Sequence, residues 1–275
     1  MTIAQIIENL TEKHVALDPA EPTVDGVICG DISAECTGIV LTCAPTAEVI
    51  QKAADIGSNL IICHEPTFFY GYDETDWLEG TNVYEAKREL IEKYHMVIFR
   101  DHDRTHSEQP DMIYYGIVKK LGWENYKVNE GFFPVAEFTV PQTTLEQLGY
   151  EVAQKLNIDG LRVVGDLNMP VRNVALMAHF LGHEEDKTGI LCIDRNDYDV
   201  VIPLEIIDWT ITEYIMDSTA LGHPRGMLNV GHFNLEEAGV EMMADWIRSE
   251  IVGQAVPVTF IQSGNMYRWL ERPKQ

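Results

Sequence analysis

The stretch CTGIVLTCAPTAEVIQKAADIGSNLIIC, residues 36–63, has two short apolar runs on either side of an amphipathic segment. The β-branched and apolar residues of 36–43 and 59–63 predict two buried strands. Residues 46–57 predict a helix between them, because Thr46 can cap its start and Gly57 can end it. This strand–helix–strand order predicts parallel strands joined by a right-handed crossover.

The same alternation continues along the chain. On either side of residues 36–63, further apolar patterns predict helices at 2–15, 83–94 and 107–122, and a strand at 96–99. Farther on, they predict helices at 143–156, 208–220 and 234–251, and strands near 161–165, 173–178, 189–193, 199–203, 227–231 and 256–261. For the helix at 143–156, Thr143 and Glu146 predict a capping box. The fold class is therefore expected to be α/β with mostly parallel sheets.

Composition limits the classes of function. The 275 residues carry 20 Lys and Arg against 44 Asp and Glu, a net charge of −24, which disfavours binding to nucleic acid. No apolar run approaches the ~20 residues that a membrane helix needs, and the N-terminus does not have the pattern of a signal peptide. Five cysteines without a CxxC pair predict reduced thiols and a cytoplasmic protein.

Three stretches place histidine directly after a predicted strand: LIICHEPTFF (60–69), IFRDHDRTH (98–106) and VGHFNLEEAG (230–239). Each by itself also fits a polar strand cap, a salt-bridged surface turn or an ordinary helix start. Ligands of open parallel sheets bind outside the carboxyl ends of the strands, so the three stretches can face one site. The predicted metal ligands are His64, Glu65, His102, His106, His232 and Glu236.

Four imidazoles and two carboxylates are too many for one closed tetrahedral site. They fit two divalent ions ~3.5–4 Å apart, of zinc, manganese or iron. The leading hypothesis is metal-dependent hydrolysis of a small-molecule substrate, of cyclohydrolase or phosphoesterase type. In it Glu65, or an aspartate such as Asp101 or Asp103, acts as general base, and Arg100 or Arg104 holds an anionic group. We name Glu65, Asp103 and Arg104 as the catalytic candidates.

Two other functions stay open: a regulatory or scaffold protein whose metal is structural, and a mononuclear iron oxygenase. The remaining histidines have less specific surroundings. His179 and His183 are interpreted as local hydrogen-bonding residues, His223 as a loop residue, and His14 and His95 as structural. Glu205 follows a predicted strand and is interpreted as a helix-start carboxylate.

The three histidine stretches resemble the motifs of the Nif-three-like family, whose bacterial members are often labelled GTP cyclohydrolase I type two. GHFNLEE matches the family's C-terminal motif in full, whereas Glu65 stands where a second His is usual and His106 where Asp is usual. The resemblance implies two interleaved α/β domains, a metal centre in the cleft between them and a homohexamer. With it, we expect a metal-binding domain at 1–125 and 226–275, and a second domain at 126–225.

Overall fold

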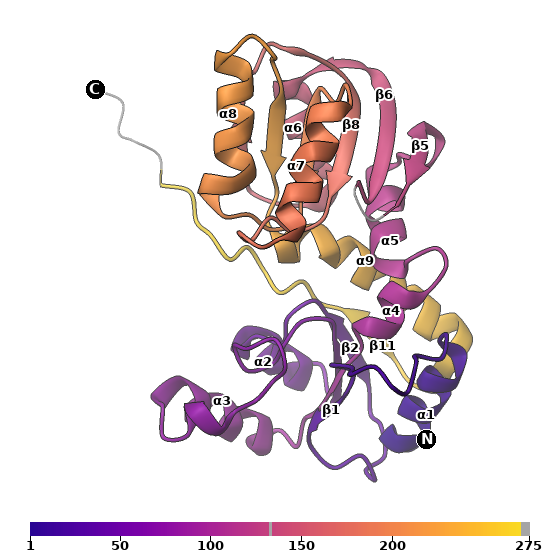
Figure 1. The fold of residues 1–275 in the computed structure, drawn as a ribbon. Coiled ribbons are helices and arrows are strands. Elements are labelled where there is room, and N and C mark those ends of the chain that lie inside the picture. The colour runs from indigo at the N-terminus through magenta and orange to yellow at the C-terminus, as the bar shows by residue number, and fades with distance from the viewer. Residues whose placement is uncertain (132–133, 271–275) are drawn as a thin grey trace. The chain divides into compact units, whose positions relative to one another are not determined.

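A computed structural model describes residues 1–131 and 134–270 of the chain (Figure 1). The chain forms two units. The first comprises Met1–Ile117 and Glu236–Gly264, and the second comprises Val118–Leu235 and the chain from Asn265 onward. The chain thus leaves the first unit after Ile117, returns to it at Glu236 and leaves it again after Gly264. The first two boundaries lie eight and ten residues from the expected 125/126 and 225/226, and the chain from Asn265 onward was expected in the first domain. The expected ranges also include residues 132–133 and 271–275, which lie outside the described part.

The first unit is built on a five-stranded sheet of order β1-β4-β3-β2-β11, in which only the β1–β4 pair is antiparallel. Its strands are β1 (Gly26–Cys29), β2 (Ile39–Thr42), β3 (Leu60–Cys63), β4 (Val97–Arg100) and β11 (Val258–Phe260). Its helices are α1 (Ile3–Lys13), α2 (Ala47–Asp55), α3 (Asn82–Lys93), α4 (Asp103–Ser107), α5 (Met112–Leu121) and α9 (His232–Ile247), with short turns η1 (Asp76–Leu78) and η4 (Arg248–Val252). Helices α5 and α9 each continue across a unit boundary.

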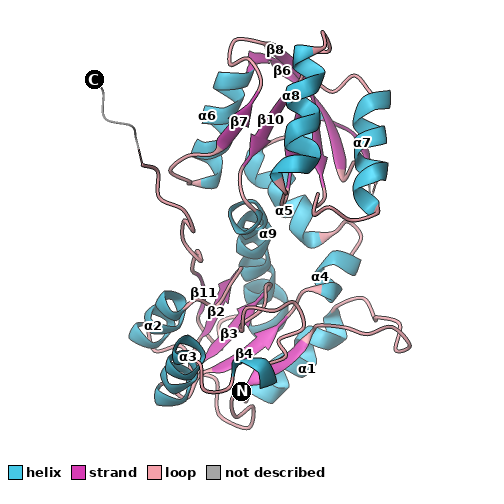
Figure 2. Cartoon of the chain, turned by 60° about the vertical axis from the view of Figure 1, so that its left-hand side comes forward, coloured by secondary structure: helices cyan, strands magenta, loops and turns pink. Residues whose placement is uncertain are grey.

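Both faces of this sheet are covered at its centre, where β2, β3 and β4 are buried along their whole length. Figure 2 shows α2 and α3 on one face and α1 on the other. Alternate strand residues such as Val40, Ile61 and Ile98 pack against α2 and α3, where Ile50 and Ile91 are buried. Successive side chains of a strand point to opposite faces of the sheet, so the intervening residues lie on the opposite face. The strand–helix–strand prediction for residues 36–63 is therefore confirmed.

The second unit holds a six-stranded sheet of order β5-β6-β8-β9-β10-β7. Its strands are β5 (Lys127–Glu130), β6 (Ala136–Thr144), β7 (Arg162–Val164), β8 (Pro170–Met177), β9 (Val200–Pro203) and β10 (Gly226–Asn229). Its helices are α6 (Leu145–Leu156), α7 (Glu185–Arg195) and α8 (Glu213–Ala220), with turns η2 (Glu124–Tyr126) and η3 (Asp208–Thr212). Only the β8–β9 and β9–β10 pairs are parallel. The α/β class is confirmed, but this sheet is mixed, because its outer strands pair antiparallel.

Three local predictions were wrong. Residues 189–193 lie in α7, since a short apolar run also fits one turn of a buried helix. The helix expected at 107–122 begins later: Ser107 is the end of α4, and α5 begins at Met112, after Pro110. The cap of α6 is Thr144, whose side chain accepts a hydrogen bond from the Gln147 amide.

Among residues 1–131 and 134–270, no helix combines the length and the apolar character needed to cross a membrane.

Helices α5 and α9 approach each other through two glycines, Gly116 and Gly239. A Cβ atom on Gly239 would overlap the Cα atom of Ile113 and lie 2.7 Å from its carbonyl oxygen. A backbone cannot move aside as a flexible side chain can, so Gly239→Ala is expected to destabilise the protein by about 1–3 kcal/mol. Urea unfolding measures this difference. Gly71→Ala is the control, because its Cβ atom would have open space, and equal stability of the two variants would contradict the close approach.

Candidate metal centre

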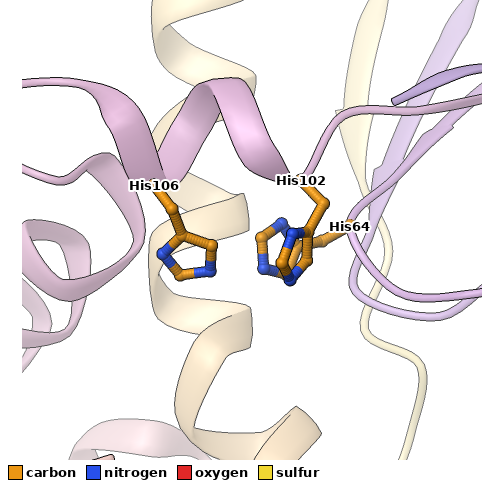
Figure 3. A group of neighbouring side chains, drawn as sticks. All are labelled: His64, His102 and His106. Atoms are coloured by element: carbon orange, nitrogen blue, oxygen red, sulfur yellow. The ribbon is translucent and has the colours of Figure 1, made fainter. Parts of the chain in front are cut away.

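Three histidines of the first unit come together at the ends of two adjacent strands. Strands β3 and β4 are parallel neighbours, paired up to Cys63 and Arg100. His64 follows β3 at once, and His102 lies two residues beyond β4, on the turn into α4. Their ring centroids are 4.5 Å apart, and that of His106 lies 5.0 Å and 4.8 Å from those of His64 and His102. Figure 3 shows the three rings gathered beside α9.

Each of these rings has an acceptor for its Nδ1 nitrogen. The partners are the Asp101 carbonyl oxygen for His64 at 3.2 Å, Asp103 Oδ1 for His102 at 2.8 Å, and Asp111 Oδ2 for His106 at 2.8 Å. A carbonyl or carboxylate oxygen only accepts, so each Nδ1 carries the proton and Nε2 presents its lone pair. Metal-binding histidines commonly have such an acceptor behind them, because it fixes the tautomer and the ring orientation.

Two buried carboxylates join this group. His64, Glu65 and Glu236 offer ligand atoms within 4.8 Å of one another, as do His64, His102 and His106. The Glu236 Oε2 atom is 3.5 Å from His64 Nε2, and Glu65 and Glu236 are 8% and 1% exposed. Burying carboxylates is costly unless positive charge lies close to them. The Arg100 guanidinium lies 3.9 Å from Glu65 Oε2, and the group of carboxylates and imidazole nitrogens offers further ligand atoms to a cation.

The side-chain chemistry fits a divalent cation of the zinc, manganese or iron(II) type, which imidazole nitrogens and carboxylate oxygens bind well. Burial raises the pKa of Cys63, the residue before His64, to about 12, so its thiol stays protonated in the absence of a cation. Burial alone would lower the pKa of His106, but Asp111, Glu236 and Glu65 raise it above the ordinary value. In the absence of a cation, that ring accordingly takes up a proton more readily.

The turn that carries these histidines is held by Asp25, which lies directly before β1. Its Oδ1 atom accepts from the amides of His102 and Asp103 at 2.7 Å each. Its Oδ2 atom accepts from the Arg104 amide at 3.0 Å and from Arg104 Nη1 at 2.9 Å. The Asp25 side chain is 0% exposed. Asp25 thus caps α4 from a distant part of the chain, and no local sequence pattern predicts this contact.

The three catalytic candidates have different surroundings. Asp103 Oδ1 accepts from His102, and its Oδ2 atom accepts from the Val24 amide at 2.9 Å. The hydrogen bond from the His102 ring holds the pKa of Asp103 below its ordinary range, so this side chain stays a carboxylate that orients His102. Arg104 is paired with Asp25, whereas Glu65 lies in the ligand group. Their catalytic roles stay predictions.

Two polar residues near the site serve the structure around it. Arg100 is 3% exposed, and its guanidinium donates to the carbonyl oxygens of His64 at 3.1 Å and Gly71 at 2.5 Å. It therefore fixes the loop after β3. Asp101 is also buried and lies 3.1 Å from His14 Nε2. Burial lowers the pKa of His14, but Asp101 and Glu108 together raise it above its ordinary value.

The sixth predicted ligand, His232, belongs to the second unit. Its Nδ1 atom is 3.3 Å from Glu205 Oε2, and its ring centroid is 4.8 Å from that of His179. His179, Glu205 and His232 form a third group with ligand atoms within 4.8 Å of one another. Sequence reasoning interpreted His179 and Glu205 as local residues, although both come two residues after a strand. The placing of His232 with the other five ligands stays a prediction.

The chain consists of two α/β units, and each unit has histidines and carboxylates just beyond the ends of its parallel strands. These features are typical of an α/β protein that binds metal. The model of the family Duf34/NIF3 (NGG1p interacting factor 3) matches residues 1–265, and the chain belongs to this family. The resemblance of the three histidine stretches is thereby confirmed.

One similar protein sequence and two similar solved structures support this family membership. A protein of Clostridium perfringens named GTP cyclohydrolase 1 type 2 homolog is 26% identical over 219 residues, which are 77% of this chain and 78% of that protein. A hypothetical protein of Staphylococcus aureus has a similar fold, with a TM-score of 0.69 at 18% identity over 98% of this chain and 99% of that one. A Bacillus cereus protein related to NIF3 has a TM-score of 0.69 at 16% identity, covering 99% of both chains.

Proposed function

We propose that the first unit binds two divalent cations at His64, Glu65, His102, His106 and Glu236, and that the protein is a metal-dependent hydrolase of a small molecule. The main support for the proposal is that His64 is a member of two ligand groups, one with His102 and His106 and one with Glu65 and Glu236. One tetrahedral ion takes four ligands in all, so three imidazoles and two carboxylates exceed what one ion with a bound water needs. Two ions that share this set match the number of ligands.

The chain's own residues suit the chemistry. A bound divalent cation polarises the scissile bond and lowers the pKa of bound water to ~7. Asp103 and Asp111 orient His102 and His106, so that their Nε2 atoms point away from these carboxylates. Glu65 is buried beside His64 and can receive a proton at its carboxylate when it is not a ligand. Asp25 keeps the α4 turn in place.

The experiment starts with the metal content of protein purified without added ions, which separates two ions, one and none. Hydrolysis of phosphoesters, cyclic amides and nucleotides is then measured with zinc, manganese or iron(II). The name of the C. perfringens relative is the reason to include nucleotides with rings that can be opened. We expect turnover of at least one class that a chelator abolishes and added metal restores.

The control is Glu48→Gln, which removes an exposed carboxylate paired with Lys52 on α2 and is expected to leave metal content and turnover unchanged. Protein that holds its full metal complement and hydrolyses none of these substrates would contradict the hydrolase. It would favour a regulatory or scaffold protein with a structural metal. The homohexamer and the cytoplasmic location stay predictions.

A further inference from the structure

His14 is a buried histidine of the first unit and directly follows α1. Its side chain is 0% exposed, and both of its ring nitrogens face carboxylates. The Nε2 atom lies 3.1 Å from Asp101 Oδ2, and the Nδ1 atom lies 2.9 Å from Glu108 Oε1. The ring also packs against Trp246 of α9, at 4.9 Å between ring centroids. The fold therefore places one imidazole, away from solvent, between two acidic side chains from a distant part of the chain.

These two contacts together require a proton on each ring nitrogen. An ionised carboxylate only accepts hydrogen bonds, whereas a neutral imidazole has a single N–H group. The doubly protonated ring donates to both carboxylates, and their charges compensate its own. In agreement with this, burial lowers the pKa of His14, but the hydrogen bonds and charges of Asp101 and Glu108 raise it above its ordinary value. His14 is accordingly a buried cation that joins two acidic residues.

The two acidic residues lie on either side of the turn that carries candidate metal ligands. Asp101 is the residue before His102, and Glu108 follows the last residue of α4, the helix that contains His106. The backbone of Asp101 has a second role, because its carbonyl oxygen accepts from His64 Nδ1 at 3.2 Å. The His14 ring therefore contacts both ends of the α4 turn, and one of its partners is also the acceptor behind the His64 ring.

We propose that His14 is a positioning residue for the cation site of the first unit. Through Asp101 it sets the orientation of the His64 ring, and through Glu108 it fixes the end of the helical turn that carries His106. The inference rests on the proposed cation site but not on hydrolysis. His14 is not itself a ligand, because both of its nitrogens are engaged with carboxylates.

A buried ion pair that merely holds the end of α1 in place is the simpler account. It predicts that a change of His14 lowers stability and leaves the ligand rings of the folded protein as they were. It gives no reason for both partners to flank the α4 turn, nor for Asp101 to hold the His64 ring through its carbonyl oxygen. The two accounts therefore differ in what happens to His64 and to cation binding in a folded variant.

The test compares His14→Gln with His14→Asn in the full chain. The amide nitrogen of glutamine can take the place of Nε2 and that of asparagine the place of Nδ1, so the first variant keeps a donor toward Asp101 and the second keeps one toward Glu108. Nitrogen NMR of isotope-labelled histidine rings in the metal-free protein reports which nitrogen carries the proton. We expect His64 to keep its Nδ1 proton in the unchanged chain and in His14→Gln, and to exchange between both tautomers in His14→Asn.

Cation binding is then measured with cobalt(II) and zinc(II) in competition with a chromophoric chelator. We expect His14→Asn to bind about 10–100-fold more weakly, with altered cobalt absorption bands, because residues that only orient metal ligands have effects of this size. The affinity of His14→Gln should lie between that of His14→Asn and that of the unchanged chain. The matched control is His183→Asn, at an exposed histidine of the second unit, which is expected to equal the unchanged chain.

Glu108→Gln decides the outcome if His14→Asn does not fold, because the Glu108 side chain is 22% exposed and the change keeps its shape. It should bind cations more weakly than Glu12→Gln, which alters an exposed carboxylate of α1. An unchanged His64 tautomer and unchanged cation affinity in folded His14→Asn, or equal affinity of the two glutamate variants, would overturn the positioning role. Tautomers that change as expected in a chain that binds no cation would support it and contradict the proposed function alone.

Discussion

A chain with His64→Ala is expected to lose the cations of the first unit, with an affinity about 10²–10³-fold lower. His64 is the residue shared by both ligand groups of that unit, so its removal affects each of them. Zinc binding of ~10–16 kcal/mol in four-ligand sites corresponds to roughly 2.5–4 kcal/mol for each ligand. Competition with a chromophoric chelator, followed by metal analysis of the recovered protein, measures the change.

The matched control is His95→Asn, because His95 is an exposed histidine of the same unit with a φ of 49° that asparagine tolerates. Alanine at position 64 also leaves a gap in a buried site, so His106→Ala serves as a second variant at a residue with 22% side-chain exposure. Metal affinity that is unchanged in both variants, with both still folded, would contradict the assignment.

The sequence was sufficient to place His64, His102 and His106 near one another. Apolar runs before His64 and His102 predicted neighbouring parallel strands, and parallel strands bring their carboxyl ends to one edge. The spacing of His102 and His106 then predicted a shared helical face. In the structure α4 supplies that turn, and the three rings lie within 5.0 Å of one another.

Contacts between polar groups far apart along the chain could not be predicted from the sequence. Asp25 is 77 residues from His102, and His14 is 87 residues from Asp101. Such pairs have no periodicity and no fixed spacing, so they follow only once the sheet has placed β1 beside β4. For α7 a signal did exist: Glu185 in its first turn and Arg195 in its last suit a helix dipole.

Asp25→Ala is expected to destabilise the protein by about 3 kcal/mol. The substitution leaves the Arg104 guanidinium, whose side chain is 18% exposed, without its carboxylate, and it removes the acceptor of three backbone amides at the start of α4. Breaking a buried ion pair at one partner costs about 3–5 kcal/mol, and the partial exposure of Arg104 places the effect at the lower end. Urea unfolding of the metal-free protein measures it.

The same variant should also bind cations about 10–100-fold more weakly, since residues that only orient metal ligands have effects of this size. Asp18→Ala is the control, an exposed aspartate whose Oδ1 atom accepts one local amide hydrogen bond, from Ala20. Asp25→Asn keeps one oxygen acceptor but removes the charge, so its loss of stability should lie between the two. If Asp25→Ala lost no more stability than Asp18→Ala, the α4 turn would have to be held by other contacts, and the orientation of His102 and His106 could not depend on Asp25.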